Sequence, residues 1–420
     1  MNFDAFELHQ DIIRAVALNG YEAPTPIQAK AIPSILTGRD LLGLAQTGTG
    51  KTAAFVLPII HQLMEGHRRC IRALILAPTR ELAAQINETV RVFSKGTGLR
   101  SVVIYGGVGM SPQIEALKRG VEIVVACPGR LLDHISQKRV DFSRLETLVI
   151  DEADRMFDMG FLPDIRRIAG NLPRKRQTLL FSATMPDDIR HLADDMLNDA
   201  VTVQISHTKP IETVSHALYP VEHHLKTALL RELLKTTDTD SVLVFTRTKH
   251  RAERLARQLS QAGFRATSLQ GDLSQSKREK AIEGFRKGSF QILVATDIAA
   301  RGIDVSAISH VINFDMPDTA DAYTHRIGRT GRAEKTGDAF TFVTRDDAEM
   351  VRTIEKVIGE RLARRTLAGF DYNKQDDRPA QPATQRPRQQ APRQAPRQAR
   401  PAARHSGNLR SRGDRRISQA

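Results

Sequence analysis

Residues 45–52, with the sequence AQTGTGKT, constrain the fold of this chain more than any other stretch. They follow a short apolar run at residues 41–44 and precede residues 53–60, whose apolar side chains have helical spacing. A glycine-bearing turn between a strand and a helix directs several backbone N–H groups at one place, where the helix N-terminus adds partial positive charge. The stretch matches the P-loop pattern G-x-x-x-x-G-K-[ST], with Ala45 in place of the first glycine. We therefore expect Lys51 to reach the β- and γ-phosphates of a nucleotide and Thr52 to hold Mg²⁺.

Residues 151–154 supply the acidic partner that such a phosphate site needs. Their sequence is Asp-Glu-Ala-Asp, and they follow the apolar run at residues 148–150, which reads as a buried parallel strand. In open α/β sheets ligands bind at the carboxyl ends of the strands. We expect Asp151 to orient Mg²⁺ through its waters and Glu152 to polarise the attacking water as general base. Together the two stretches predict a nucleotide hydrolase.

The charge and cysteine content limit the class of partner and the compartment. The net charge of the 420 residues is +14, of which +8 falls on residues 371–420. This excess indicates a polyanionic partner. Cys70 and Cys127 form neither a disulfide framework nor a zinc spacing, which fits a reducing compartment. With no signal-peptide pattern and no apolar run near the ~20 residues of a membrane span, we expect a soluble, cytoplasmic protein without a membrane partner.

Short apolar runs alternate with helical patterns in two successive regions, which predicts an α/β fold with two parallel sheets. We expect a segment at 1–29, a first domain at 30–205, a linker at 206–216 and a second domain at 217–370. In the first domain, each run ends in polar, glycine or arginine residues, so these endings should share one edge of the sheet. The second domain lacks both GKT and an acidic strand end. It cannot bind ATP alone but can supply arginines to ATP bound by the first.

Several local expectations complete this outline. Residues 4–20 and 29–36 have helical patterns, residues 325–332 are expected on a helix, and residues 339–343 resemble an edge strand. Between the first two helices, the amide of Gln28 suits the edge of an adenine, and Tyr21 could stack on its ring. Residues 371–420 are rich in Pro, Gln and Arg and cannot bury enough apolar surface to fold, so we expect a disordered tail. It either tethers nucleic acid electrostatically or serves as a solubilising tail.

With these strand endings in order, the chain resembles the DEAD-box RNA helicases of superfamily 2, and most closely their bacterial RhlE-type branch. The resemblance covers roughly residues 3–370. It implies two RecA-like domains that close on ATP, Mg²⁺ and single-stranded RNA, and that locally unwind duplex RNA.

The resemblance also implies roles for individual residues on the nucleotide side. The catalytic group would be Lys51, Asp151, Glu152 and the arginine fingers Arg329 and Arg332, with the metal held by Thr52 and Asp151. Residues that connect hydrolysis to unwinding would be Asp154, Ser182, Thr184 and, at the domain interface, His325. The nucleotide would further contact Phe3, Tyr21, Thr25, Gln28, Ala45, Gln46, Thr47, Gly48, Thr49, Gly50, Gly302 and Asp304.

For RNA, the matching positions are hydroxyls, arginines and glycine N–H groups rather than readers of base edges. They suit sugar–phosphate contact, so we expect indifference to sequence and sensing of the 2′-hydroxyl. One departure is Cys127, which stands where the family usually has Thr and offers only a weak donor. The positions are Pro78, Thr79, Arg80, Gly106, Gly107, Pro128, Gly129, Arg130, Arg247, Gln275, Arg278, Thr296 and Asp297.

Three other functions compete with duplex unwinding. An ATP-gated RNA clamp or chaperone would use the same motifs and release little strand. A double-stranded DNA helicase would be stimulated by DNA, and the resemblance argues against it. An inactive scaffold is disfavoured because Lys51, Glu152, Arg329 and Arg332 are all present. Ribosomal or mRNA-decay complexes stay open as partners, because no module in the chain directs the core to either.

Overall fold

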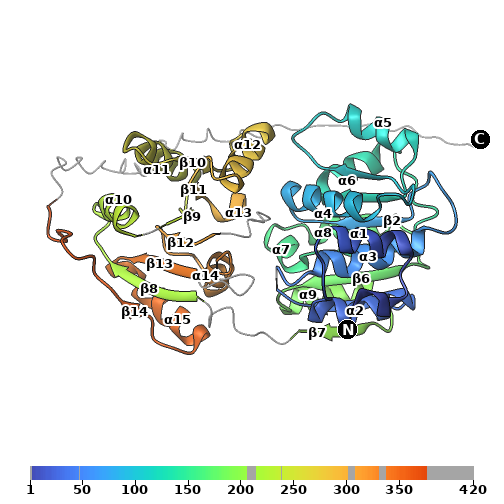
Figure 1. The fold of residues 1–420 in the computed structure, drawn as a ribbon, viewed down its shortest axis with the longest axis horizontal. Helices are drawn as coiled ribbons and strands as arrows, with labels where there is room; N and C mark the ends of the chain where they lie inside the picture. Colours follow the sequence, from blue (N-terminus) through green and yellow to red (C-terminus); the bar gives the residue numbers. More distant parts are fainter. Residues whose placement is uncertain are drawn as a thin grey trace, which may run out of the picture. The chain divides into compact units, whose positions relative to one another are not determined.

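The computed structural model describes residues 2–46, 48–205, 214–237, 239–300, 308–330 and 337–375. These residues form two seven-stranded sheets, and every strand pairing within each sheet is parallel (Figure 1). We call residues 2–205 the first domain and the described part of residues 214–375 the second domain. The prediction of an α/β fold with two parallel sheets is confirmed.

The first sheet has the strand order β3-β4-β2-β5-β6-β1-β7. In its central strands β2, β4 and β5 every residue is buried, and all but Thr147 are aliphatic, as expected for parallel strands covered on both faces. The edge strands β3 and β7 are only partly buried. The strands are β1 (Leu41–Leu44), β2 (Ala73–Leu76), β3 (Ser101–Ile104), β4 (Ile123–Ala126), β5 (Thr147–Ile150), β6 (Gln177–Ser182) and β7 (Val201–Gln204).

Helices cover both faces of this sheet because successive strand residues point to opposite sides. In β2, Ala73 and Ile75 pack with the first four α-helices, whereas Leu74 and Leu76 pack with later ones. The elements of the first face are η1 (Phe3–Phe6), α1 (Gln10–Leu18), α2 (Pro26–Leu36), α3 (Lys51–Leu63) and α4 (Arg80–Phe93). Those of the second face are α5 (Ser111–Arg119), α6 (Pro128–Ser136), α7 (Ala153–Asp158), α8 (Leu162–Ala169) and α9 (Asp187–Met196).

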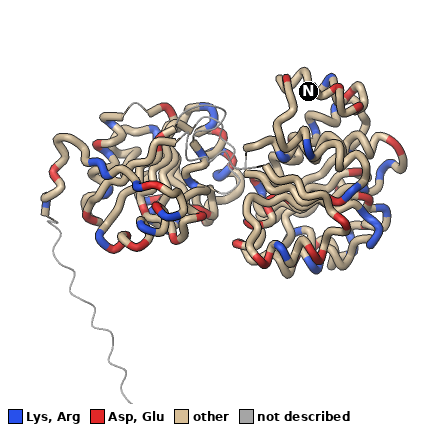
Figure 2. The backbone as a smooth tube through the Cα atoms, turned by 90° about the horizontal axis from the view of Figure 1, so that it is seen from below, with Lys and Arg blue, Asp and Glu red and all other residues tan. Residues whose placement is uncertain are grey.

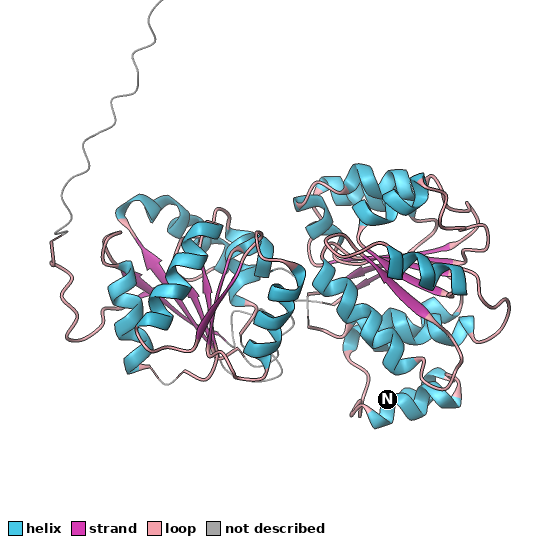
Figure 3. Cartoon of the chain, turned by 90° about the horizontal axis from the view of Figure 1, so that it is seen from above, coloured by secondary structure: helices cyan, strands magenta, loops and turns pink. Residues whose placement is uncertain are grey.

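The second sheet repeats the topology of the first. Its order, β10-β11-β9-β12-β13-β8-β14, is that of the first sheet with seven added to each strand number. Helices again flank the strands on both sides (Figure 3). The strands are β8 (Val214–Pro220), β9 (Val242–Phe245), β10 (Ala266–Leu269), β11 (Ile292–Ala295), β12 (His310–Asn313), β13 (Gly337–Val343) and β14 (Ala363–Arg364). The helices are α10 (Lys226–Thr236), α11 (Lys249–Gln261), α12 (Gln275–Arg286), α13 (Asp297–Ala300), α14 (Ala320–Ile327), η3 (Arg345–Asp347) and α15 (Ala348–Ile358).

The structure corrects four local expectations. Residues 214–216, expected in the linker, are the first residues of β8. Strand β13 is not an edge strand, because it lies between β12 and β8 and buries most of its residues. Helix α14 ends at Ile327, so Arg329 follows the helix rather than lying on it. Residues 4–20 contain a short 3₁₀ helix and a separate α-helix instead of one continuous helix.

The boundary of the folded part lies slightly later than expected. The compact unit extends to Lys374, whose carbonyl contacts His224 Nε2 at 2.7 Å, and the Tyr372 hydroxyl accepts a hydrogen bond from the Leu367 N–H at 2.9 Å. The rest of the expected tail, from residue 376, lies outside the described residues. Within the part of the chain that the structure describes, no helix combines the length and apolarity needed to cross a membrane.

Candidate active site

The loop between β1 and α3 has the geometry that its glycines predict. Gly48 and Gly50 both have positive φ angles, of 87° and 92°, a region that side chains other than glycine rarely occupy. A Cβ at Gly50 would also lie 2.6 Å from Gln28 Nε2. Helix α3 begins at Lys51, whose Nζ is buried and donates to the Ala45 carbonyl at 2.8 Å. The loop is therefore closed around its lysine.

Gln28 contacts this loop directly. Its Nε2 donates to the Gly50 carbonyl at 3.1 Å, and its Oε1 accepts from the Thr25 N–H at 2.9 Å. Gln28 lies in the first turn of α2, which begins at Pro26, so the helix starts earlier than the sequence suggested. The side chain is only 1% exposed. The segment expected to read adenine is thus joined to the phosphate loop by a hydrogen bond.

Two aromatic residues expected near the nucleotide pack close to this segment. The rings of Phe3 and Tyr21 meet edge to face at 6.2 Å, and Tyr21 also meets Phe93 at 5.4 Å. Phe3 is buried, whereas Tyr21 is 37% exposed. Of the two rings, Tyr21 is therefore the more exposed.

The carboxylates follow strand β5, at the edge of the sheet that also carries the phosphate loop. Asp151 is buried, and this burial raises its pKa to about 7, while the nearby Lys51 ammonium acts in the opposite direction. Glu152 has a positive φ of 52° and is the N-cap residue immediately before α7. Its Oε2 lies 2.5 Å from Arg155 Nη1, and both side chains are buried.

Arg155 is a functional candidate that the sequence reading missed. The available signal was its i,i+3 spacing from Glu152, which precedes α7 as its N-cap residue. A buried carboxylate needs a partner, because leaving a charge unpaired in the interior is costly. The guanidinium of Arg155 therefore fixes the rotamer of Glu152.

Asp154 joins the acidic strand end to the end of β6. Its Oδ2 accepts from the N–H groups of Ala183 and Thr184 at 3.1 and 3.0 Å and from Thr184 Oγ1 at 3.1 Å. Ser182 Oγ accepts from the Asp154 N–H at 3.3 Å and donates to the Thr184 carbonyl at 2.7 Å. The Ser182 carbonyl in turn accepts from the Ala45 N–H at 3.0 Å. One network thus connects the phosphate loop, the acidic segment and the end of β6.

Three separated stretches expected to contact RNA meet at the carboxyl ends of the first sheet. Gly107 has a φ of 81°, and a Cβ there would collide with the Arg80 guanidinium. A Cβ at Gly106 would lie 3.8 Å from Arg80 Nη2 and 3.9 Å from Arg130 Nη2. Arg130 also donates to the Val108 carbonyl at 3.2 Å. Two guanidinium groups therefore lie over a glycine turn, an arrangement suited to an anionic backbone.

The cap of α6 differs from the cap of α4 next to it. Thr79 caps α4 by accepting from the Leu82 N–H at 3.2 Å. Cys127 occupies the same position before Pro128 and Gly129 at the start of α6, and its side chain makes no cap hydrogen bond. The thiol is thus a poorer cap than the Thr that the resemblance leads one to expect.

The buried position of Cys127 gives a prediction about its reactivity. Burial raises the pKa of this thiol to about 12, so at pH 8 only about one molecule in 10⁴ carries the reactive thiolate. We expect iodoacetamide to label half-buried Cys70 in the folded protein and to label Cys127 only after unfolding. Peptide mass spectrometry would measure both, with Cys70→Ser as the unlabelled control. Equal labelling rates at the two thiols would contradict the burial of Cys127.

In the second domain, Arg326 anchors the segment that carries His325 and Arg329. Its Nε and Nη2 bind the two oxygens of Asp297 at 2.6 and 2.7 Å, and its Nη1 donates to the Asp315 carbonyl at 2.8 Å. The guanidinium also lies 5.0 Å from the ring centre of Phe245. Sequence reading gave Arg326 no role, and it expected Asp297 to contact RNA. Both oxygens of Asp297 accept from Arg326, and its contact with RNA stays a prediction.

His325 and Arg329, which were expected to act at a domain interface, are also largely shielded from solvent. Arg329 is 6% exposed, and its N–H donates to the Arg326 carbonyl at 3.1 Å. Burial lowers the pKa of His325, so the neutral imidazole is favoured there. Four other predicted nucleotide residues lie outside the described residues, namely Thr47, Gly302, Asp304 and Arg332.

The remaining positions expected to bind RNA lie at the carboxyl ends of β9 and β11 or on α12. The Arg247 N–H donates to Asp315 Oδ2 at 2.9 Å, and its side chain is exposed beside Asp318. Arg278 lies on α12, with its Nη1 and Nη2 each 3.4 Å from a carbonyl, those of Gln270 and Ala299. Gln275 begins the same helix, and Thr296 directly follows β11. They lie at the carboxyl ends of the strands of the second sheet. In the first sheet, the corresponding edge carries the phosphate loop and the acidic segment.

The repeated topology explains why the second domain has no phosphate site of its own. Strand β8 corresponds to β1, and α10 begins with Lys226 as α3 begins with Lys51. The connection before Lys226 is Val-Glu-His-His-Leu, which contains no glycine. Lys226 is buried, donates to the Phe314 carbonyl at 3.0 Å and lies 4.0 Å from Asp315 Oδ1. This lysine serves the interior of its domain.

Comparison with known proteins shows what the whole chain is similar to. Residues 25–192 match the DEAD/DEAH box helicase family, and residues 225–334 match the helicase conserved C-terminal domain. The chain is 43% identical over 361 residues to the ATP-dependent RNA helicase CshA of Listeria monocytogenes, covering 86% of this chain and 69% of the relative. It is 41% identical over 365 residues to the DEAD-box ATP-dependent RNA helicase CshA of Bacillus subtilis, covering 87% and 74%.

A solved structure matches over the same range. Dbp5 of S. cerevisiae, bound to RNA and ADP BeF3, superposes with a TM-score of 0.77 at 30% identity, covering 87% of this chain and 95% of that chain. The relatives named here carry the CshA name, so the expected placement in the RhlE-type branch stays a prediction.

Proposed function

Because the chain belongs to the DEAD-box family of ATP-dependent RNA helicases, we propose that RNA closes its two RecA-like domains on ATP, and that the resulting hydrolysis drives local separation of short RNA duplexes. One observation carries this proposal. A continuous set of hydrogen bonds runs from Gln28 through the phosphate loop to Ser182, and from there to Asp154. A nucleotide that moves the loop therefore moves residues at the ends of several strands.

The residues of the first domain fit ATP with Mg²⁺. Lys51 would transfer its Nζ from the Ala45 carbonyl to the β- and γ-phosphates. Thr52 would supply a hard oxygen ligand, and Asp151 would orient the ion through its bound waters. This suits Mg²⁺, which proteins hold with one or two side chains together with phosphates and water. Bound there, the ion would neutralise negative charge on the phosphates.

The hydrolytic step would use one base and one stabilising cation. Glu152, held by Arg155, would accept a proton from the attacking water while the water oxygen forms its bond to the γ-phosphorus. The bond from that phosphorus to the β–γ bridging oxygen breaks, and ADP leaves. Arg329 would stabilise the charge on the transferred phosphoryl group, with Arg332 as a second finger. Neither finger belongs to the domain that binds ATP, so hydrolysis requires closure.

RNA would bind at the carboxyl ends of both sheets. Arg80 and Arg130 lie together over Gly106 and Gly107, where they would contact phosphates. Dbp5, the structural match, is bound to RNA and ADP BeF3, which supports joint binding of strand and nucleotide here. Because ATP and RNA both favour closure, each would raise the affinity for the other. A strand bent by closure cannot stay paired, so a short duplex opens.

The test is steady-state ATPase activity with single-stranded RNA, with single-stranded DNA of the same sequence, and with neither. We expect stimulation by RNA alone, together with strand release from a short RNA duplex. Equal stimulation by DNA would overturn the assignment to RNA. RNA-stimulated hydrolysis without strand release would instead support an ATP-gated clamp.

Two topologically equivalent lysines provide a matched pair of variants for this assay. Lys51→Met should abolish ATP hydrolysis, because it removes the cation at the phosphates. Lys226→Met should lower the melting temperature through the loss of a buried hydrogen bond yet retain RNA-stimulated activity at low temperature. Loss of ATP binding in the Lys226 variant would contradict a purely structural role for this lysine.

A further inference from the structure

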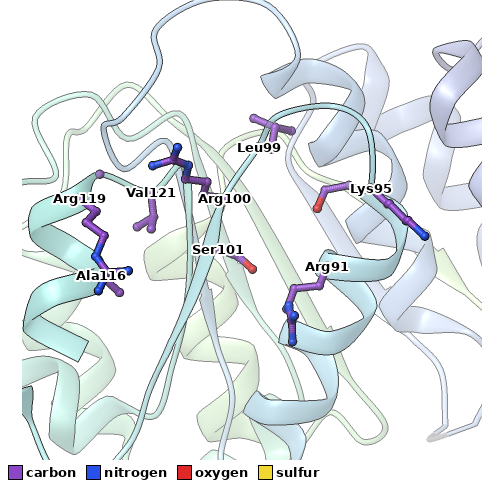
Figure 4. Close-up of a pocket in the computed structure, with 10 residues that line it drawn as sticks. Arg91, Lys95, Leu99, Arg100, Ser101, Ala116, Arg119 and Val121 are labelled. Carbon is purple, nitrogen blue, oxygen red and sulfur yellow. The ribbon is translucent and has the colours of Figure 1, made fainter. Parts of the chain in front are cut away.

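A basic cavity lies at the amino end of β3. The candidate active site is at the other end of the strands, where their carboxyl ends lie. Its volume is about 620 Å³. Figure 4 shows Arg91 and Lys95 on one side, Ala116 and Arg119 of α5 on the other, and Arg100 and Ser101 between them. The cavity is thus formed where the carboxyl ends of α4 and α5 meet the start of β3.

The charge around this cavity is one-sided. Four cations line it, from Arg91, Lys95, Arg100 and Arg119, and no carboxylate is among the lining residues. Figure 2 shows, by contrast, that both signs of charge alternate along most of the two domains. Within the described residues the side chains of Lys95 and Arg100 form no ion pair. Two of the four cations are therefore available to a ligand.

The nearby carboxylates do not cancel this charge. Glu88 and Glu115 pair with Arg91 and Arg119 at 3.1 Å each, and all four side chains are exposed, so solvent weakens these pairs. Glu122 is buried and accepts from the N–H groups of Arg69 and Arg100 at 2.6 and 2.8 Å. Its charge is thus already used by the backbone.

Ser101 adds an unsatisfied polar group. Its Oγ is inaccessible to solvent and has no hydrogen-bond partner among the described residues. A buried hydroxyl without a partner is unfavourable, so rotation of the Ser101 side chain toward a ligand oxygen in the cavity would be stabilising. Cations together with a free hydroxyl suit an oxyanion such as a phosphate group.

We propose that this cavity binds the sugar–phosphate backbone of RNA that extends beyond the candidate active site. Helix α4 connects the candidate active site to the cavity. It begins with Arg80 at the carboxyl ends of the strands, and Arg91 lies in its last turn beside the cavity. A helix of 14 residues spans about 21 Å, which a strand covers with about six nucleotides at 3.4 Å each. This inference rests on the proposed function, since it requires RNA at the carboxyl ends of the strands.

The test compares two RNA lengths in the presence of a non-hydrolysable ATP analogue. The short probe is the shortest single strand that gives full ATPase stimulation of the full chain. The long probes carry about 12 further nucleotides, placed at either end in turn. The variant is Lys95→Gln/Arg100→Gln, which leaves the backbone bonds to Glu122 in place. The matched control is Arg174→Gln/Lys175→Gln, two exposed cations before β6 on the same edge of the sheet.

We expect the variant to bind one of the long probes about three- to tenfold more weakly at moderate salt and to bind the short probe as the wild type does. For that long probe, the slope of log K against log[salt] should become shallower by about 1.4, because two phosphate contacts on a single strand are lost. The inference would be overturned if the variant bound both long probes as the wild type does. It would also be overturned if the variant lost as much affinity for the short probe, or if the control variant lost as much affinity for the long probe. A wild type that binds no RNA would instead overturn the proposed function.

Discussion

Replacing Glu152 by Gln should lower RNA-stimulated ATP hydrolysis by about 10²- to 10⁴-fold, the usual contribution of a general base. The amide keeps the shape of the side chain but cannot accept the proton of the attacking water. ATP and RNA should therefore remain bound together, because the step that reopens the domains is blocked. A filter-binding assay with labelled RNA and ATP would detect this trapped complex. Hydrolysis at the wild-type rate would rule out Glu152 as the base.

The structure adds a second consequence of this substitution. The carboxylate of Glu152 balances the buried guanidinium of Arg155, so the Gln variant leaves a buried cation unpaired. We expect a lower melting temperature for this variant. In the double variant with Arg155→Met, stability should return toward that of the wild type while hydrolysis stays low. Glu232→Gln, on an exposed pair with Lys235, is the matched control and should change neither property.

Replacing Arg329 by Ala should lower the rate of hydrolysis by about 10³-fold or more, the range found when an arginine finger is removed. ATP binding to the isolated first domain does not involve this residue, so the affinity for ATP should change far less than kcat. Single-turnover hydrolysis and binding of a fluorescent ATP analogue would separate the two quantities. A large loss of ATP affinity with an unchanged kcat would contradict the role of a finger.

Two other arginines control for structural effects of this substitution. Arg352→Ala, on the exposed side of α15, should leave hydrolysis unchanged. Arg326→Ala should lower stability as well as activity, because its guanidinium binds Asp297 and two groups near the end of β12. If Arg329→Ala behaved like Arg326→Ala, with melting temperature and rate falling together, Arg329 would be a structural residue.

Much of the first domain could be predicted because its signals are local. The glycines of the phosphate loop, the aliphatic run of β5 and the carboxylates after it each report a backbone requirement that neighbouring residues satisfy. The parallel sheets followed from the alternation of strands and helices, and the carboxyl-end rule then placed the motifs at one edge. The length and position of these stretches could be predicted without knowing which distant residues they contact.

Apart from helix boundaries, the errors in the fold lie where contacts are between distant residues. Strand β13 looked like an edge strand, yet its neighbours β12 and β8 are separated from it in sequence, so its pairing could not be seen. The basic cavity likewise joins α4, β3 and α5, which show no common pattern in the sequence.

The sequence by itself led to the chemistry proposed for this protein, because Lys51, Asp151 and Glu152 lie in short segments whose residue types are typical of phosphate and metal sites. The tertiary structure decided how these groups are held. Arg155 pairs with Glu152, Gln28 is bonded to the phosphate loop, and Asp297 binds Arg326. The physical reason is that a buried charge or amide must find a partner, and only the folded chain determines which partner is within reach.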